Sequence, residues 1–369
     1  MNVVIAAGGT GGHFYPALAL AEEFRRQAAD TSVTLVGTGR ALEQTMLADA
    51  PWRMETLRVQ GVAGRGTCST VKALLLIPGA VWQCLRLLRA ANADLVVGTG
   101  GYTSPPVVLA ALLLGIPRAV VELNAVPGIA NRVLGPLASR IFVSLDRAKP
   151  YFRAGKVSVV GTPLRRAFVA TSPSLGSGRV DTLLVCGGSQ GARAMNSLVL
   201  EAVQASSLIR SRLAVIHQSG VNDFDRVSRA YRTMNVEAEV VPFIEDMSRT
   251  LRRADLVICR CGALTLSEIA ACAKPSILIP FPQATHNHQE SNARVVEQAG
   301  AGIVLLQPAL TGVRLAGEIE GLLHAPDRVR RMAEQSLRLR STDSAEALVR
   351  ECYRLLGRNP PERTMTNGV

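Results

Sequence analysis

The chain has 369 residues, of which 48% are hydrophobic, 19% charged and 4% aromatic. This length exceeds one hydrophobic core and predicts two globular domains, and the composition excludes an intrinsically disordered protein. The formal net charge of +12 favours anionic partners, such as a phosphorylated ligand or an acidic lipid surface. Scattered arginines, few aromatic residues and the lack of a recognisable binding motif argue against nucleic acid as a partner.

The seven cysteines are odd in number and show no Cys-x-x-Cys spacing, which argues against a disulfide framework or a zinc site. Such thiols fit a reducing cytoplasm. The first residues lack the basic region and cleavage site of a secretory signal, and no apolar run reaches the about 18 residues of a spanning helix. We therefore expect a protein that stays inside the cell, without a signal peptide or a transmembrane helix.

Short β-branched runs alternate with longer helical patterns in the first half of the chain. Strands are predicted at 3–6, 33–36 and 95–97, and helices at 16–29, 41–48 and 105–114. This alternation is typical of βαβ units and predicts a mostly parallel sheet. Residues 160–166 are predicted to end this domain, and the Ser/Gly/Pro-rich segment 171–179 has the composition of a linker.

The second half of the chain repeats the pattern. Strands are predicted at 182–186, 214–218, 256–259 and 276–280. Residues 3–13 resemble residues 182–192, and residues 93–104 resemble residues 254–265, which predicts two similar doubly wound domains. We place the first domain at 1–165 and the second at 166–356, with a last helix that is able to pack back on the first domain. The polar tail 357–369 is predicted to be disordered.

Each half begins with a strand that leads into a glycine-rich turn, at residues 8–13 and 187–192. Such turns expose backbone N–H groups at the positive end of the next helix, where a phosphate can bind. Alternatively, the glycines only allow tight turns and close packing. Neither turn completes G-x-G-x-x-G, and no P-loop motif occurs, which argues against a dinucleotide oxidoreductase and a P-loop NTPase. Two equivalent turns favour contacts with a different nucleotide or a sugar.

Seven segments carry a more specific pattern. In chain order they are GGTGGHFYPALAL (8–20), GTGGYTSPP (98–106), ELNAVPGIAN (122–131), GTPLR (161–165), GGSQGA (187–192), CRCGALTLSEIA (259–270) and HNHQESNA (286–293). Over almost the whole chain they resemble the MurG family of UDP-N-acetylglucosamine transferases. The resemblance implies an α/β GT-B glycosyltransferase fold, with two Rossmann-like doubly wound domains separated by a cleft, the acceptor bound mainly by the first and the donor by the second.

The same resemblance implies an inverting glycosyltransferase of peptidoglycan synthesis, with a part in cell shape and division. The enzyme would move N-acetylglucosamine (GlcNAc) from UDP-GlcNAc to the 4-hydroxyl of the N-acetylmuramic acid (MurNAc) of undecaprenyl-pyrophosphoryl-MurNAc-pentapeptide (lipid I), which gives lipid II. It would act as a peripheral protein on the cytoplasmic face of the inner membrane, on anionic lipid. Other cell-wall synthesis proteins are candidate partners.

Inversion needs a base for the acceptor proton and groups that stabilise the departing UDP. His13 follows the first glycine turn at a predicted helix start, where the helix dipole favours the neutral, proton-accepting imidazole. His13 is therefore the first candidate for the base, and the alternative is a capping or sugar-binding residue. Glu122 is the reserve candidate, with the alternative role of ordering the loop beside it.

The family motifs also imply donor contacts in the second domain. Backbone amides at Ser189 and Gln190 would bind the diphosphate, and the Glu268 carboxylate would bind the ribose hydroxyls. The Ile244 backbone would contact the uracil edge, and Gln289 would contact a GlcNAc hydroxyl. Further positions that match donor contacts are Thr10, Gly11, Gly12, Asn124, Arg165, Ala263, Leu264, Thr265, Leu266 and Ser267. Each of these could alternatively be a turn or surface residue.

Two short patterns imitate metal ligands. Asp223-x-Asp225 looks like the D-x-D of metal-dependent transferases, and His286-x-His288 could pair on one ion. Each lacks a third ligand nearby in the sequence, so no functional metal is expected. UDP-GlcNAc is the only small molecule that the resemblance requires.

Residues 72–89 combine apolar and basic side chains, as an interfacial segment does. The candidate membrane contacts are Lys72, Leu74, Leu75, Ile77, Val81, Trp82, Arg86 and Arg89. Pro78 and Gly79 are expected to break the segment into two pieces. The alternative is an ordinary amphipathic core helix, and the location of the membrane-facing patch in the family favours the membrane surface.

Three other functions compete with the lipid I transferase. Another GT-B lipid glycosyltransferase and a UDP-sugar epimerase share the fold, but the segments GGTGGH and ELNAVPGIAN argue against both. A catalytically silent UDP-sugar-binding regulator is the third, and the presence of His13, Glu268 and Gln289 argues against it.

Overall fold

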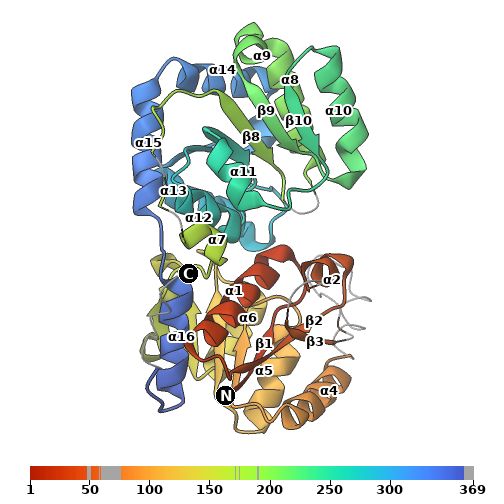
Figure 1. The fold of residues 1–369 in the computed structure, drawn as a ribbon, viewed down its shortest axis with the longest axis vertical. Coiled ribbons are helices and arrows are strands. Elements are labelled where there is room, and N and C mark those ends of the chain that lie inside the picture. Colours follow the sequence, from red (N-terminus) through yellow and green to blue (C-terminus); the bar gives the residue numbers. More distant parts are fainter. Residues whose placement is uncertain are drawn as a thin grey trace. The chain divides into compact units, whose positions relative to one another are not determined.

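The computed structural model describes residues 1–47, 51–57, 59, 76–170, 172–173, 175–188 and 191–360. Predictions for Lys72, Leu74, Leu75, Ser189, Gln190 and tail residues 361–369 therefore lie outside the described residues. The chain forms two compact α/β units (Figure 1). Unit 1 contains residues 1–165 and the chain from residue 343 onward, and unit 2 contains residues 166–342.

Unit 1 is built on a parallel sheet, which has seven strands in the described part of the chain. In spatial order the strands are β3 (Arg53–Thr56), β2 (Ser32–Gly37), β1 (Asn2–Ala6), β4 (Leu95–Gly98), β5 (Arg118–Glu122), β6 (Arg140–Val143) and β7 (Val157–Val159). Its helices are α1 (Gly11–Gln27), α2 (Ala41–Leu47), α4 (Ile77–Ala90), α5 (Ser104–Leu113), α6 (Ile129–Leu134) and α16 (Ser344–Leu355). The chain reverses its direction of travel across the sheet between β1 and β4, which is the switch point where ligands bind in such folds.

Unit 2 repeats this architecture with a parallel sheet of six described strands. In spatial order they are β10 (Ala238–Val241), β9 (Ala214–Gln218), β8 (Thr182–Cys186), β11 (Leu256–Cys259), β12 (Ser276–Leu278) and β13 (Gly302–Val304). Its helices are α7 (Arg166–Val169), α8 (Arg193–Ala205), α9 (Ser207–Arg212), α10 (Phe224–Thr233), α11 (Met247–Arg253), α12 (Ala263–Ala271), α13 (His288–Gln298), α14 (Gly312–Leu323) and α15 (Pro326–Arg338). Because β8 and β11 occupy the places of β1 and β4, the prediction of two similar doubly wound domains is confirmed.

The last helix, α16, belongs to unit 1 and lies beside α1 (Figure 1). The rings of Phe24 and Tyr353 meet at 6.5 Å between centroids, and Arg26 pairs with Glu346 at 3.3 Å. The segment 343–356, which the sequence boundaries assigned to the second domain, thus packs on the first. The described residues of the predicted linker, 172–173 and 175–179, belong to unit 2, where Gly178 is buried against the backbone of Pro326.

The structure shows where helices α1 and α4 begin. Helix α1 begins at Gly11, before the predicted start at Pro16, because the Thr10 carbonyl accepts bonds from the amides of His13 (3.0 Å) and Phe14 (3.1 Å). Helix α4 begins at Ile77, so Pro78 and Gly79 lie at its start, and the first part of the segment that they are expected to divide lies outside the described residues. Pro78 lies in the first turn of α4, where a missing N–H costs no helical hydrogen bond. Among the described residues, no helix is long and apolar enough to cross a membrane.

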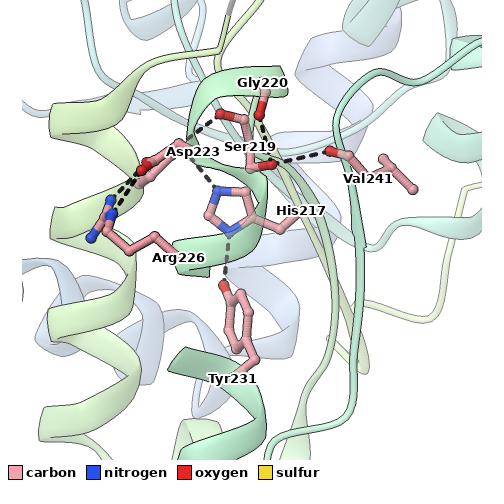
Figure 2. Close-up of polar contacts among 8 residues, drawn as sticks. His217, Ser219, Gly220, Asp223, Arg226, Tyr231 and Val241 are labelled. Carbon is pink, nitrogen blue, oxygen red and sulfur yellow. Dashed lines mark hydrogen bonds and ion pairs between the residues drawn. The ribbon is translucent and has the colours of Figure 1, made fainter. Parts of the chain in front are cut away.

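A buried polar network lies beside the end of β9 in unit 2 (Figure 2). His217 lies 2.9 Å from the Tyr231 hydroxyl through Nδ1 and 3.0 Å from Asn196 Oδ1 through Nε2. An amide oxygen only accepts, so the neutral ring carries its proton on Nε2 and accepts the Tyr231 proton on Nδ1. Asn196 Nδ2 donates to Asp223 (2.8 Å), and Arg226 binds both oxygens of the same carboxylate (2.7 Å each).

Burial of His217 makes the stability of unit 2 depend on pH. Desolvation lowers the pKa of His217 to about 3, whereas the same ring titrates near 6.5 in an unfolded chain. The unfolded chain therefore binds one more proton below pH 6.5, and the stability contributed by the neutral ring falls as the pH falls toward 3. We expect a loss of about 1.4 kcal/mol in unfolding free energy per pH unit from this residue between pH 6 and pH 5.

Denaturant unfolding of wild type and His217→Gln at several pH values in this window measures the effect. The variant is less stable at pH 7, but its unfolding free energy falls less steeply as the pH is lowered. Asp223, whose pKa is lowered mainly by its hydrogen bond with Arg226, adds its own loss closer to pH 4, so the window between pH 6 and pH 5 isolates the histidine. Parallel pH dependences of the two proteins would contradict a buried neutral ring.

Candidate active site

The turn between β1 and α1 is tied to the loops beside it by two of its own amides. Gly8 N donates to Thr103 Oγ1 (2.8 Å), and Gly9 N donates to Glu43 Oε1 (3.1 Å). These amides are thereby used within the protein. Fewer backbone amides are thus left for an anion than the predicted glycine loop implied. They lie at the exposed Thr10 and in the first turn of α1, at Gly11 and Gly12.

Glu43 is a buried anchor of this turn that sequence reasoning missed. Besides Gly9 N, its carboxylate accepts bonds from Thr38 N (2.7 Å), Thr38 Oγ1 (2.9 Å) and Gly39 N (2.8 Å). It thereby joins the loop after β2 to the turn after β1. The available signal was an acidic residue in the first turn of a helix that follows Gly37, the last residue of β2, and Gly39.

His13 lies in the first turn of α1 and packs on the loop after β4. Its Nδ1 is 2.9 Å from the Thr99 carbonyl oxygen. Because a carbonyl only accepts, Nδ1 carries the proton, and Nε2 is the proton-accepting nitrogen of the neutral ring. A Cβ on Gly100 would come within 2.8 Å of the ring, and one on Gly101 within 2.5 Å of the Gly8 carbonyl oxygen. The paired glycines after β4 therefore make room for the imidazole and for the first turn.

Glu122, the reserve candidate for the base, is 2% exposed at the end of β5. Its Oε1 accepts from Asn124 N (2.8 Å) and Asn124 Nδ2 (2.9 Å), and its Oε2 from Gly128 N (3.1 Å) and Asn131 Nδ2 (2.9 Å). Four donors occupy this carboxylate, which leaves little capacity to take a substrate proton. The geometry favours the alternative role, in which Glu122 orders the loop that carries Asn124.

Arg165 joins two of the family segments in unit 1. Its guanidinium carbon lies 4.0 Å from the centroid of the Tyr15 ring on α1, a cation–π distance. This contact brings the segment 161–165 to the helix that carries His13. Of the predicted residues, Thr10, Gly11, Gly12, His13 and Arg165 thus lie on or against the first part of α1. Glu122 and Asn124 lie at the end of β5 and in the loop after it.

In unit 2, the turn between β8 and α8 is held by close backbone contacts. A Cβ on Gly187 would come within 2.6 Å of the Ala192 amide nitrogen, and one on Gly191 within 2.3 Å of the Ser219 carbonyl oxygen. Gly188 and Gly191 have φ angles of 85° and 73°, which glycine adopts without strain. The predicted diphosphate contacts Ser189 and Gln190 lie inside this turn, outside the described residues.

The first two turns of α12 contain six predicted donor residues. The helix begins after Gly262, and its early positions Ala263, Leu264, Thr265, Leu266, Ser267 and Glu268 lie near the carboxyl end of β11. Glu268 and Leu266 are buried, and the others in this stretch are half-buried. Ile244, the predicted uracil contact, is also buried, so its side chain packs in the protein and its backbone is the part suited to a base edge.

Gln289 on α13 is oriented by its amide oxygen. Oε1 accepts from the amides of Cys261 (3.1 Å) and Phe281 (3.0 Å), while Asn292 Nδ2 donates to the Cys261 carbonyl (3.2 Å). The start of α13 is thereby bound to the loop that leads into α12. Within the described residues, Nε2 of Gln289 has no acceptor, so its two N–H groups are the part of the side chain suited to a sugar hydroxyl.

Arg260, which sequence reasoning also missed, lies 7% exposed at the end of β11. Its NH1 donates to the carbonyls of Ile279 and Pro280 (3.1 Å each), and its NH2 donates to Gln307 Oε1 (2.5 Å). Burial lowers the pKa of this guanidinium. The signal was a charged side chain directly after a fully buried strand.

The two patterns that imitate metal ligands have other contacts. The Asp223 carboxylate is bound by Arg226 and Asn196, as described above, and His288 Nδ1 lies 2.7 Å from the Thr285 carbonyl oxygen. Across the described ranges, no group of three or more His, Cys, Asp and Glu side chains is placed to hold a metal ion. The six described cysteines are buried free thiols.

Helix α4 presents a mixed apolar and basic face. Ala80, Cys84 and Leu88 point into the core, whereas Trp82 is 60% exposed and Arg86 stacks over its indole at 4.9 Å. The other predicted membrane contacts on this helix divide between half-buried Ile77 and Val81 and exposed Arg89. Helix α4 packs against α5, whose Leu113 is also largely exposed.

Comparison with known proteins extends the resemblance found in the sequence. Residues 3–143 match the glycosyltransferase family 28 N-terminal domain, and residues 182–348 match the family 28 C-terminal domain. The chain is 44% identical over 360 residues (97% of this chain, 94% of the relative) to an Anaeromyxobacter sp. (strain Fw109-5) protein. It is 40% identical over 357 residues (96% and 99%) to a Syntrophus aciditrophicus (strain SB) protein.

Both relatives are named UDP-N-acetylglucosamine–N-acetylmuramyl-(pentapeptide) pyrophosphoryl-undecaprenol N-acetylglucosamine transferase. Among solved structures, the chain resembles Acinetobacter baumannii MurG with a TM-score of 0.74 and 30% identity, covering 94% of this chain and 98% of the other. The predicted GT-B fold class is thereby confirmed. The chain belongs to glycosyltransferase family 28 and, within it, to the MurG family.

Proposed function

We infer that this chain is an inverting N-acetylglucosaminyltransferase of peptidoglycan synthesis. It transfers GlcNAc from UDP-GlcNAc to the MurNAc 4-hydroxyl of lipid I and releases UDP and lipid II. The inference rests on the full-length relationship to transferases of that name. The orientation of His13 adds the chemical support within this chain, since it presents a proton-accepting nitrogen at the start of α1.

His13 is the proposed general base. The Thr99 carbonyl holds Nδ1–H, so Nε2 takes the proton of the acceptor hydroxyl as its oxygen bonds to the anomeric carbon of GlcNAc. In the same step the bond from that carbon to the UDP oxygen breaks, and UDP departs with the bonding electrons. Glu122 is assigned the supporting role of ordering the loop with Asn124, because its four bonds already compensate its charge.

The donor is proposed to bind to unit 2 through two helix starts. The amides at the start of α8, with Ser189 and Gln190, face the diphosphate, and the positive end of the helix stabilises the charge that develops on departing UDP. Glu268 on α12 accepts from the ribose hydroxyls, and Gln289 donates to a GlcNAc hydroxyl. These helix termini and basic side chains carry the leaving-group charge, so the proposed transfer needs no metal.

Helix α4 is proposed to bring the enzyme to its lipid substrate at the cytoplasmic face of the membrane. Trp82 offers an amphipathic ring to the headgroup region, and Arg86 and Arg89 attract anionic lipid. Lys72, Leu74 and Leu75 extend the same segment in sequence. This assignment makes the protein a peripheral one, in line with its net charge of +12.

Removal of the proposed base tests the reaction directly. In His13→Asn the amide nitrogen takes the place of Nδ1 and keeps the bond to Thr99, but no proton acceptor remains at the position of Nε2. We expect turnover of UDP-GlcNAc with a lipid I analogue, followed by product analysis, to fall about 100-fold or more, with UDP affinity unchanged. His13→Ala should lose as much turnover. Normal turnover in a folded His13→Asn protein would remove His13 from the base role.

Two substitutions at Gln289 separate its positioning bonds from its proposed sugar contact. Gln289→Glu keeps oxygens for the Cys261 and Phe281 amides but loses the N–H donors, whereas Gln289→Ala loses both. We expect Gln289→Glu to raise the KM for UDP-GlcNAc about tenfold while UDP itself binds as to wild type. Equal KM values for Gln289→Glu and wild type would rule out the sugar contact.

Substitution of the exposed indole tests the membrane assignment. Trp82→Ser removes the largest exposed apolar side chain of α4, and binding to vesicles with anionic lipid should weaken about tenfold or more. The matched control is Val313→Ser on α14 of unit 2, an apolar side chain that is 73% exposed and should leave vesicle binding unchanged. Cosedimentation measures both. A folded Trp82→Ser protein that binds vesicles like wild type would reject this face.

A further inference from the structure

The polar network around His217 reaches beyond the core to the loop after β9. Besides Asp223, Asn196 Nδ2 also donates to the Ser219 carbonyl oxygen (2.9 Å). Ser219 is fixed from its other side, since its amide donates to the Val241 carbonyl (3.0 Å) and its hydroxyl lies within bonding distance of the Gly220 and Val241 carbonyls. Figure 2 shows Ser219, Gly220 and Val241 grouped beside His217. The Ser219–Gly220 peptide is therefore held in one orientation.

The Ser219–Gly220 peptide packs directly against Gly191 in the β8–α8 turn. A Cβ on Gly191 would come within 2.3 Å of the Ser219 carbonyl oxygen and 2.7 Å of Gly220 Cα, so the two backbones are in direct contact. The preceding residue of β9 contributes a second tie, because Gln218 Nε2 donates to the Gly188 carbonyl (2.9 Å). Residues at the end of β9 thus contact both Gly188 and Gly191, the two described residues of the turn that have positive φ.

Asn196 links the Ser219–Gly220 peptide to α8, the helix that follows the turn. It lies on α8 and is fully buried, and both ends of its amide are used: Oδ1 accepts from His217, and Nδ2 donates to Ser219 and Asp223. The chain of bonds has one direction, from the Tyr231 hydroxyl through His217 to Asn196 and on to the Ser219 carbonyl. An apolar side chain would fill the same space but would not hold that carbonyl.

We propose that Asn196, held by His217, is a positioning residue for the nucleotide, because it fixes the Ser219 carbonyl against which Gly191 packs just before α8. The inference rests on the proposed function, in that the turn between β8 and α8 receives UDP. Asn196 itself touches no substrate. Its effect is to keep the amides at the start of α8 within the narrow tolerance that binding of a diphosphate demands.

The test is UDP affinity and the split between KM and kcat in two variants. Asn196→Ala removes all the bonds, and Asn196→Leu removes them while keeping the same branched side-chain skeleton, in case the alanine variant does not fold. We expect the Kd for UDP, measured by calorimetry, and the KM for UDP-GlcNAc to rise about tenfold or more in each folded variant. The kcat at saturating donor should stay within about twofold of wild type, because the reacting groups are unchanged.

Val199→Ala is the matched control for a merely structural role. Val199 is fully buried on the same helix and faces the hydrophobic core of unit 2, so its truncation leaves a cavity without touching Ser219. It should lower the melting temperature and leave the Kd for UDP unchanged. A folded Asn196 variant with wild-type affinity, or an equal loss of affinity in Val199→Ala, would overturn the proposal. Failure of the wild-type protein to bind UDP would instead overturn the proposed function and this inference with it.

Discussion

In both units, the loops that follow neighbouring strands approach each other backbone to backbone. The positions of the glycine turns depend on this close contact. In unit 1, Gly101 lies so near the Gly8 carbonyl that a Cβ would come within 2.5 Å of it, and in unit 2 Gly191 meets the Ser219 carbonyl in the same way. Each contact joins two loops that leave the same edge of a parallel sheet. Because any side chain would push these loops apart, the glycines determine where the first turns of α1 and α8 lie.

The two glycine turns differ in which of their backbone groups are bonded within the protein. In unit 1, Thr103 and Glu43 take the amides of Gly8 and Gly9, and the residue that follows the glycines is a histidine whose ring rests on Gly100. In unit 2, Gln218 donates to the Gly188 carbonyl, and Ser219 packs against the Gly191 backbone. Similar folds thus give the two helix starts different surroundings, which the proposed function uses for a base in unit 1 and for a diphosphate in unit 2.

Sequence patterns predicted β1, β8, β9 and β11, which are apolar runs between clear turns, but missed the buried strands β5 and β6. They missed short strands such as β3, with the sequence RMET, and β13, whose three residues are only half-buried, because these are defined by their neighbours in the sheet. Family motifs identified the segments of the site. They could not assign the role of Glu122 or find Glu43, because each role depends on hydrogen bonds to loops that only the fold brings together, such as that from Gly9 to Glu43.

The histidines of the two units differ in burial, because His217 is fully buried and His13 is half-buried. His217 is neutral over the whole range above its pKa of about 3, so the network beneath the diphosphate turn keeps the same hydrogen bonds from mildly acidic to alkaline conditions. His13 lies half-buried in the first turn of α1, and its Nδ1 is bonded to the Thr99 carbonyl. We therefore expect no change in the charge of the His217 ring near neutral pH, so the proposed roles of Asn196 in donor binding and of His13 as the base can be tested separately.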